Sequence, residues 1–99
     1  VDYNKWQATG RSNEITAIEP FIDKWKAFGW HSTEINGHDF NEIQSAFTDC
    51  HKQKDKPSMI IAHTIKGKGV SFMEDDNNWH YKIPNELEVN KSKKELGLL

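Results

Sequence analysis

The spacing of hydrophobic positions changes several times along the chain, and each change predicts a new element. Four apolar side chains recur at helical spacing, as in a helix that packs one face against a core: Phe21, Ile22, Trp25 and Phe28. We expect this helix to span about residues 19–28. Pro20 suits its first turn, where a missing N–H costs nothing, and Gly29 follows its last turn.

A second helix is predicted from about residue 39 to residue 52. Asp39 is placed to be its N-cap, and Glu42, three residues on, would complete a capping box. This structural role explains Asp39 without a catalytic one. The apolar stripe of this helix is expected to consist of Phe40, Ile43, Phe47 and either Cys50 or His51.

Three extended stretches alternate with these helices. Residues 1–3 end a strand, residues 30–36 alternate loosely up to Gly37, and residues 58–65 form a near-continuous apolar run. Such a run indicates a strand buried on both faces, as in a parallel sheet. The order of elements predicts an α/β fold, with a parallel sheet and flanking helices. Residues 4–13 read as loop, and Pro84 and Asn85 open a last, polar helix that ends near residue 96.

Length and composition bound the domain count. The 99 residues allow one domain at most, and 35% hydrophobic content with a mean hydropathy of −0.83 is low for a freestanding α/β domain. Four Trp and five Phe argue against disorder, because disordered chains are poor in aromatic residues. The chain starts at Val1 in what reads as the end of a strand. We therefore expect residues 1–99 to be a single partial domain.

Charge and cysteine content exclude several classes of protein. The net charge of −2 and the pI near 6.2 give no electrostatic footprint for nucleic acid. No apolar run approaches a membrane span, and no signal peptide is present. The single cysteine, Cys50, excludes an internal disulfide and is expected to be inert. These features predict a cytoplasmic protein.

Polar residues that could carry chemistry follow the predicted strands. Asn4, His38 and Lys66 each come shortly after a strand, so we expect them at one edge of the sheet, where open α/β folds bind ligands. The side-chain oxygen of Asn4 suits a hard cation such as Mg²⁺ or Ca²⁺. Lys66 and Lys82 suit phosphate groups. His80, between them in sequence, can exchange a proton near neutral pH.

Other polar residues have simpler interpretations. Lys68 is expected to be solvated, and the acids at positions 74–76 read as a solvated charge run in a flexible loop rather than a metal cluster. His31 and His51 are expected to be structural or exposed, and His63 to lie in the strand core or at its edge. The position of His38 at a strand end leaves its role open.

Four motifs, in order and spacing, resemble transketolases, and above all the N-terminal subunit of split transketolases. They cover nearly the whole chain and match the second half of the family's cofactor-binding domain. The motifs are Asp2-Tyr3-Asn4 with Gln7; Ala27-Phe28-Gly29-Trp30 followed by Asn36-Gly37-His38-Asp39; Thr64-Ile65-Lys66-Gly67-Lys68-Gly69-Val70; and Trp79-His80-Tyr81-Lys82-Ile83-Pro84.

The resemblance implies thiamine diphosphate as cofactor. It implies that the Asn4 side chain and the Trp6 backbone carbonyl ligate the metal, Mg²⁺ or Ca²⁺, that holds the diphosphate. A third metal ligand and the glycine-rich phosphate cradle of the family have no match in this sequence. Lys66, Lys82 and Gln7 would line the cofactor site.

The resemblance also implies a catalytic residue. His80 would contact the donor substrate and help move a proton, while the thiazolium carbon of the cofactor acts as nucleophile. Tyr81 departs from the family pattern, in which glycine follows the matching histidine. The larger side chain would narrow the site or change the sugar accepted.

The expected function is transfer of a two-carbon ketol group between sugar phosphates. By the resemblance, the active site lies at a dimer interface that needs a C-terminal transketolase subunit or domain, so the isolated chain should be inactive. Two alternatives remain. One is another thiamine diphosphate enzyme, acting on 2-oxo acids or making deoxyxylulose phosphate. The other is a non-catalytic domain that associates through an exposed sheet edge.

Overall fold

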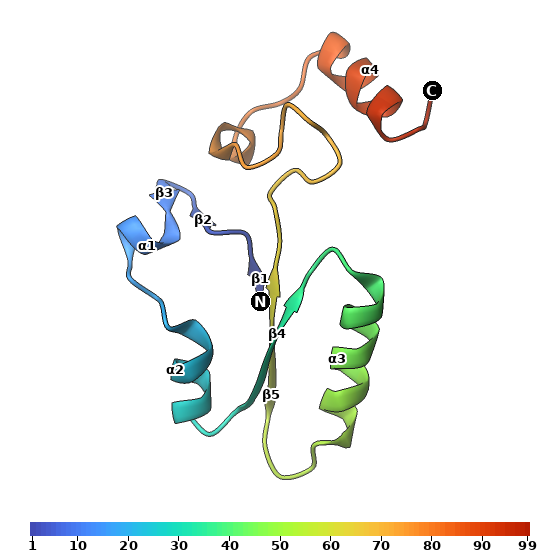
Figure 1. Cartoon of the computed structure of the whole chain (residues 1–99). Helices are drawn as coiled ribbons and strands as arrows, with labels where there is room; N and C mark the ends of the chain where they lie inside the picture. The colour runs from blue at the N-terminus through green and yellow to red at the C-terminus, as the bar shows by residue number, and fades with distance from the viewer.

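The computed structural model describes all residues 1–99 and has a three-stranded parallel sheet at its centre (Figure 1). The strand order is β1 (Asp2–Tyr3), β5 (Ser58–His63) and β4 (His31–Asn36). The central strand β5 pairs in parallel with both neighbours. Its Ile61 is 0% exposed. The prediction that residues 58–65 form a strand of a parallel sheet is therefore confirmed, with the strand ending two residues earlier, but only Ile61 is fully buried and the other residues of β5 are half-buried.

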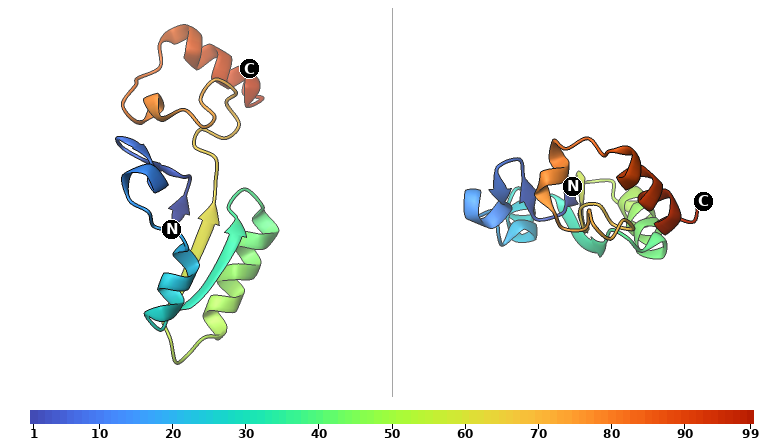
Figure 2. Two further views of the ribbon diagram at one scale, coloured as in Figure 1. Left: turned by 60° about the vertical axis from the view of Figure 1, so that its left-hand side comes forward. Right: turned by 90° about the horizontal axis from the view of Figure 1, so that it is seen from above.

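Two helices cover opposite faces of this sheet, as the views in Figures 1 and 2 agree. They are α2 (Phe21–Ala27) and α3 (Phe40–Lys52). The chain crosses from β1 to β4 by way of α2 and returns from β4 to β5 by way of α3. Because right-handed crossovers in opposite directions place their helices on opposite faces, this arrangement follows from the strand order. The predicted α/β fold is confirmed.

A chain of aromatic rings fills the face beneath α2. Tyr3 packs on Phe21 with ring centroids 5.6 Å apart, Phe21 on Trp25 at 6.1 Å, and Trp25 on Trp30 at 5.0 Å. Tilted and edge-to-face pairs of this kind contribute beyond the area they bury. These contacts link the first strand of the sheet to the start of β4.

The prediction that Phe28 belongs to this core is wrong. The helix ends at Ala27, so Phe28 occupies the C-cap and is 79% exposed. Gly29 follows with φ of 85°, as expected of the glycine after a helix. Pro20 is the N-cap residue rather than part of the first turn.

The N-cap of α3 is confirmed, but its capping box is not. The Asp39 carboxylate accepts hydrogen bonds from the backbone N–H groups of Asn41 and Glu42, at 2.8 and 3.2 Å. Glu42 does not return the bond. Its carboxylate instead accepts from the backbone N–H of Asn36, at 2.6 Å. Glu42 therefore ties the start of the helix to the end of β4.

The predicted apolar stripe of α3 is only partly correct. Ala46, at 5% exposure, lies against the sheet, and Ile43 and Cys50 are half-buried. Phe40 and Phe47 are 86% and 56% exposed, so these two assignments to the core are wrong. Ile43, Ala46 and Cys50 follow one another at three- and four-residue spacing and form the face toward the sheet, whereas Phe40 and Phe47 lie to one side of that face.

Residues 4–13, predicted as loop, contain a small hairpin. Strands β2 (Trp6–Gln7) and β3 (Gly10–Arg11) pair in antiparallel fashion and lead into the short helix α1 (Ser12–Ile15). Strands of two residues are too short to show the alternation by which a strand is recognised in a sequence.

The C-terminal third extends beyond the carboxyl ends of the strands (Figure 1). It holds a 3₁₀ helix, η1 (Asn77–His80), and the predicted last helix, α4 (Glu86–Glu95). Asn85 and Glu88 form a reciprocal capping box at the start of α4. Glu95, at the end of α4, accepts hydrogen bonds from the N–H and Oγ of Ser71, at 2.5 and 2.7 Å. These bonds anchor the loop between β5 and η1 to α4.

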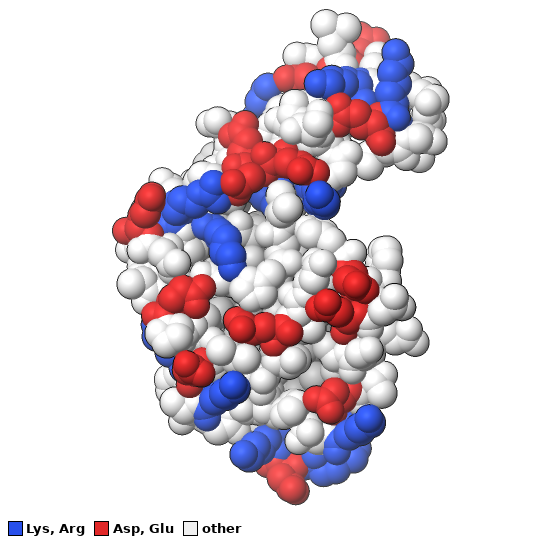
Figure 3. Space-filling view, in the orientation of Figure 1, with Lys and Arg blue, Asp and Glu red and all other residues white.

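The molecule is long and thin, and it leaves much apolar surface exposed. Its radius of gyration is 16.6 Å, against about 13 Å for a compact domain of this length. Its accessible surface is 6899 Å², against about 5800 Å² for a folded monomer of this mass. Figure 3 shows interspersed charges of both signs and a hollow beside the C-terminal part. None of the helices combines the length and apolarity needed to cross a membrane.

Candidate functional site

The three strands of the sheet end at the same level. Tyr3 is paired with His63, and His63 is paired with Asn36. The residues that follow therefore leave the sheet side by side, as the strand prediction required. Gly37 shows how close the strand ends lie, since a Cβ there would fall 2.5 Å from Cγ2 of Thr64. His38, whose role the sequence left open, accepts a hydrogen bond through Nε2 from the backbone N–H of Ile65, at 2.8 Å.

Asn4 begins a tight turn at this edge. Its side-chain Oδ1 accepts a hydrogen bond from the backbone N–H of Trp6 at 2.9 Å, and Lys5 between them has φ of 70°. The N–H of Ser12 donates to the Lys5 carbonyl at 2.8 Å. Trp6 is therefore in a non-hydrogen-bonded pair of the hairpin, and its carbonyl points away from the partner strand. The turn thus presents two neutral oxygens, from Asn4 and Trp6, on the outer edge of the hairpin.

These two oxygens suit part of a metal site. Mg²⁺ and Ca²⁺ take oxygen ligands, and Mg²⁺ is commonly held by one or two carboxylates together with phosphates and waters. Asn4 and Trp6 fit such a cation as neutral ligands. No group of three or more His, Cys, Asp or Glu side chains is arranged to hold a metal. The negatively charged ligands of such a site would have to come from outside these residues.

A polar network supports the turn. Lys5 Nζ lies 2.7 Å from His63 Nδ1, and the other ring nitrogen of His63 lies 3.2 Å from Glu34 Oε1. Lys5 also lies over the Tyr3 ring, at 3.6 Å from its centroid. Burial lowers the pKa of Lys5. His63 therefore lies at the strand end, as expected, and links β4 to the Asn4 turn through this lysine.

The three lysines of the C-terminal motifs differ in their partners. Lys82 is paired with Glu88 at 2.5 Å and lies over the Trp79 ring at 4.2 Å, and its hydrogen bond lowers the pKa of Glu88. Lys68 is paired with Glu74 at 3.4 Å. Lys66 is half-buried and forms no ion pair. Of the two lysines expected to bind phosphate, Lys66 alone has no acidic partner.

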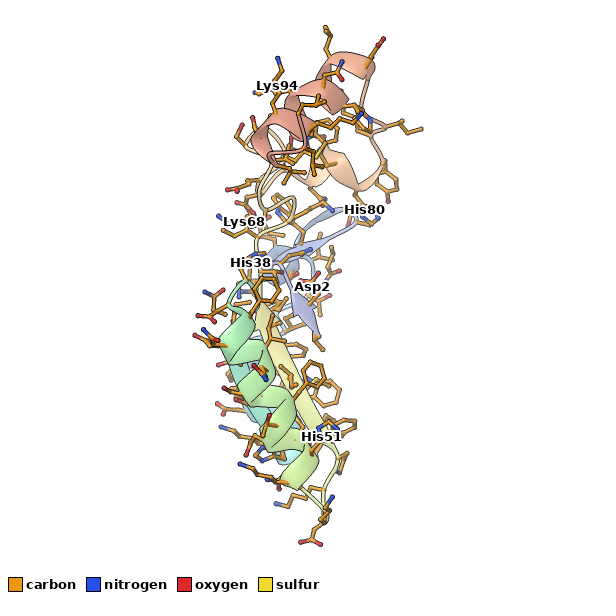
Figure 4. All side chains as sticks on the ribbon, turned by 90° about the vertical axis from the view of Figure 1, so that its right-hand side faces the viewer. Asp2, His38, His51, Lys68, His80 and Lys94 are labelled. Atoms are coloured by element: carbon orange, nitrogen blue, oxygen red, sulfur yellow. The ribbon has the colours of Figure 1, made fainter.

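His80 lies at the end of η1 and is exposed. Neither of its ring nitrogens forms a hydrogen bond within the chain, and its ring packs edge-on against Tyr81, with centroids 4.5 Å apart. Figure 4 shows His80 and Lys68 on opposite sides of the loop region. Both nitrogens of His80 are therefore free to bond to a ligand.

Nothing in the sequence indicated the residues that hold the loop between β5 and η1 against the hairpin of β2 and β3. Asp75 accepts hydrogen bonds from both terminal nitrogens of Arg11, each at 2.6 Å, and from Trp6 Nε1 at 2.9 Å. Asn77 donates to the carbonyl of Gln7 at 3.0 Å. The interpretation of the acidic run as merely solvated is therefore wrong for Asp75. Its partner Arg11 is 64 positions away, so no local pattern indicates the pair.

An open cleft of about 900 Å³ lies where the hairpin, η1 and α4 meet. Lys82 lines this cleft, but Asn4, Trp6, Lys66 and His80 do not. Its walls are formed by Ala8, Thr9, Phe72, Asp76, Asn77, Asn78, Trp79, Tyr81, Lys82 and Glu88. The predicted site residues therefore form two groups. Asn4, Trp6 and Lys66 lie at the sheet edge, and His80 and Lys82 lie on the outer loop, which is the segment between β5 and α4.

Comparison with known proteins places this arrangement in a family. The model of the transketolase thiamine diphosphate-binding domain matches residues 1–99. The chain is 53% identical over 74 residues to the 6-deoxy-6-sulfo-D-fructose transketolase subunit SqwG of Clostridium sp. (strain MSTE9), a match that covers 75% of this chain and 27% of that protein. It is 35% identical over 97 residues to an apulose-4-phosphate transketolase subunit of Phocaeicola vulgatus, covering 98% of this chain and 34% of that protein.

A solved structure agrees with the sequence relatives. The crystal structure of transketolase from Campylobacter jejuni superimposes with a TM-score of 0.85 and 30% identity, over 97% of this chain and 15% of that one. The chain thus spans about a quarter to a third of the length of the two curated relatives. Family model, relatives and solved structure agree, and the chain belongs to the transketolase family, within its thiamine diphosphate-binding domain.

Proposed function

We propose that residues 1–99 are part of a transketolase that moves a two-carbon ketol group between sugars, with thiamine diphosphate and a divalent metal. The observation that carries this proposal is the shared sheet edge, where the Asn4 turn presents two oxygens and Lys66 follows β5 without an acidic partner. The match to the thiamine diphosphate-binding domain supports the cofactor. The relatives are transketolases and transketolase subunits, which favours ketol transfer over the 2-oxo acid and deoxyxylulose phosphate alternatives.

Each residue has a defined part in this proposal. Asn4 Oδ1 and the Trp6 carbonyl bind the metal, Mg²⁺ or Ca²⁺, as neutral ligands, and Lys66 offsets the charge of the diphosphate. Thiamine diphosphate, when bound, supplies the carbon nucleophile. His80 bonds to a hydroxyl of the donor sugar and holds or moves its proton, because both ring nitrogens are free. Gln7 and Lys82 line the site. To bind the ligand, Lys82 must exchange its hydrogen bond to Glu88 for a hydrogen bond to the ligand.

The substrate we propose is a sugar that carries an anionic group. The names of the two curated relatives specify a sulfonated sugar and a sugar phosphate. Lys82 and Tyr81, in the outer loop beside His80, are the residues from which we expect discrimination between such sugars. The test is ketol transfer from 6-deoxy-6-sulfofructose and from a sugar phosphate, measured on the same preparation.

A partner subunit is part of this proposal. The two curated relatives described above are named as subunits, and the chain exposes large apolar side chains such as Phe40, Ile83 and Leu87. We propose that a C-terminal transketolase subunit or domain and a second copy of this chain complete the active site in the cytoplasm. The isolated chain is then inactive. Turnover by the pure chain would contradict this point.

The experiment that tests the function is calorimetric titration of thiamine diphosphate with Mg²⁺, with and without a candidate C-terminal subunit. We expect binding only with the subunit, and its loss in Asn4→Ala. Asn90→Ala is the control, because Asn90 is an exposed asparagine of α4 without a side-chain hydrogen bond. Absence of binding under both conditions would leave the proposal without support, and equal binding by Asn4→Ala would remove Asn4 from the metal site.

A further inference from the structure

Asp75 joins the two segments that carry the candidate cofactor ligands. Its carboxylate accepts three hydrogen bonds, from Trp6 Nε1 at 2.9 Å and from the two terminal nitrogens of Arg11 at 2.6 Å each. Its backbone N–H donates to the Lys66 carbonyl at 2.9 Å. One residue therefore holds the Trp6 side chain with its side chain and the Lys66 main chain with its own main chain.

The arrangement around Asp75 is demanding. Asp75 has φ of 55°, which non-glycine residues adopt rarely. The Arg11 guanidinium is held at both ends of its fork by the carboxylate and lies 3.7 Å from the centre of the Trp6 ring. Two parallel N–H bonds from an arginine fix orientation as well as distance. An uncommon backbone conformation persists only where the surroundings determine it, and here the side chains of Trp6 and Arg11 and the Lys66 carbonyl do so.

The position of this cluster relates it to the metal and the diphosphate. Trp6 carries the carbonyl that points outward beside Asn4 Oδ1, and Lys66 is the half-buried lysine without an ion pair. The two residues lie on segments that are far apart in sequence, β2 and the loop after β5. Asp75 contacts both segments directly, in addition to the pairing of β1 with β5 and the bond from Asn77 to Gln7.

We propose that Asp75 is a positioning residue. It holds the Asn4 turn, through Trp6, and the loop that carries Lys66 in the relative placement needed to bind a divalent metal and a diphosphate together. This inference rests on the proposed function. Asp75 touches neither ligand and acts through Trp6 and Lys66. Arg11 is its partner in this role.

The first part of the test needs no cofactor. Hydrogen exchange of the Trp6 indole N–H and of the Asp75 amide is followed by NMR in the wild-type protein, Asp75→Asn and Arg11→Met. We expect the Trp6 indole to exchange at least about tenfold faster in both variants, because either change removes the paired bonds between Arg11 and Asp75 that hold the acceptor oxygen against the indole. Asp55→Asn is the charge-matched control, since Asp55 is exposed and forms no ion pair. Unchanged exchange in Asp75→Asn would overturn the proposal.

The second part measures the Mg²⁺ concentration at half-maximal binding of thiamine diphosphate, with the C-terminal subunit present. We expect Asp75→Asn and Arg11→Met each to raise this midpoint about tenfold, at the low end of the effect of residues that support metal ligands. The double variant should be no worse than either single one, because the two residues act as one unit.

A purely structural role is separated by a core variant. Ile61→Val removes one methylene from the fully buried residue of β5. We expect it to lower Tm without moving the Mg²⁺ midpoint. If Ile61→Val and Asp75→Asn moved the midpoint equally at equal loss of Tm, the positioning role would be refuted. If the wild-type protein bound no thiamine diphosphate, the proposed function would fail and the cofactor role of Asp75 with it, while the exchange measurement would still decide whether Asp75 couples the two segments.

Discussion

The hydroxyl of Tyr3 donates a hydrogen bond of 2.6 Å to Oε1 of Glu19. Tyr3 is 4% exposed at the end of β1, whereas Glu19 lies at the surface just before α2. The second oxygen of Glu19 accepts from the backbone N–H of Phe21, at 3.1 Å. A single carboxylate thus anchors the first strand and the first turn of α2. Since Asn4 follows Tyr3 directly, this bond also fixes the base of the candidate metal turn.

Replacing Tyr3 with phenylalanine should destabilise the protein. The change keeps the ring packing on Phe21 but removes the bond to an ionised acceptor, worth about 1 to 2 kcal/mol once the exposure of Glu19 is considered. Thermal unfolding followed by circular dichroism should show Tm lower by roughly 4 to 10 °C. Tyr81→Phe is the matched control, because Tyr81 is 73% exposed and its hydroxyl forms no hydrogen bond within the chain. An equal loss in both variants would show that the Glu19 bond is not the cause.

The same bond predicts a loss of stability at alkaline pH. Burial raises the pKa of Tyr3 to about 12, and the hydrogen bond to Glu19 acts in the same direction. The folded state therefore retains a proton that the unfolded chain loses near pH 10. The free energy of unfolding contributed by Tyr3 is complete below pH 10 and falls as pH rises to about 12.

The measurement is urea unfolding at a series of pH values from about 9 to 12. The wild-type protein should lose stability across this range more steeply than Tyr3→Phe, which has no phenol at this position. Parallel curves for the two proteins would contradict the raised pKa of Tyr3.

The sequence predicted those parts of the fold that have a long, regular pattern. The apolar run of β5 indicated a central strand, and the 3.6-residue spacing indicated α2 and α3 within one or two residues of their ends. The same spacing failed for Phe40 and Phe47, because a pattern identifies an apolar face without showing whether this sheet or another chain covers it. Short elements such as β2 and η1 have too few residues for any period.

The candidate site was likewise only partly predictable from the sequence. Strand order placed Asn4, His38 and Lys66 at one edge, because the carboxyl ends of parallel strands meet there. No pattern in the sequence predicted the pairing of Arg11 with Asp75, because this pair joins a hairpin to a loop far away in the sequence through side chains alone. The ion pair that occupies Lys82 was likewise not predicted.

The N-cap of α3 offers a test of a local prediction that the structure confirms. Asp39→Ala removes the acceptor of two backbone N–H bonds and should cost about 1 kcal/mol in the free energy of unfolding. Asp39→Ser restores a capping oxygen and should recover most of that loss. Urea unfolding at neutral pH measures both. If serine behaved like alanine, the charge of Asp39 at the helix N-terminus would matter more than its hydrogen bonds.

Two glycines with the same left-handed backbone conformation should respond differently to replacement by alanine. Gly29 and Gly67 have φ of 85° and 72°, so an L side chain is strained at either position. A Cβ at Gly29 meets nothing within 4 Å, whereas a Cβ at Gly67 would lie 2.5 Å from the Met73 carbonyl oxygen. We expect Gly29→Ala to cost about 1 kcal/mol, from strain alone. Gly67→Ala should cost roughly 3 kcal/mol, because the Met73 backbone must also move.

The two variants should differ in where the damage falls as well as in its size. Gly67 follows Lys66 directly, so its displacement should speed hydrogen exchange at Val70 and Met73, whose N–H groups donate within this loop at 3.1 and 2.8 Å. Gly29→Ala should leave those amides unchanged, because it lies at the far end of the sheet from the loop. Equal costs for the two variants, with no change at Val70, would mean that the Lys66 loop yields freely at Met73. Such a loop would be too loose to hold the lysine in place for a diphosphate.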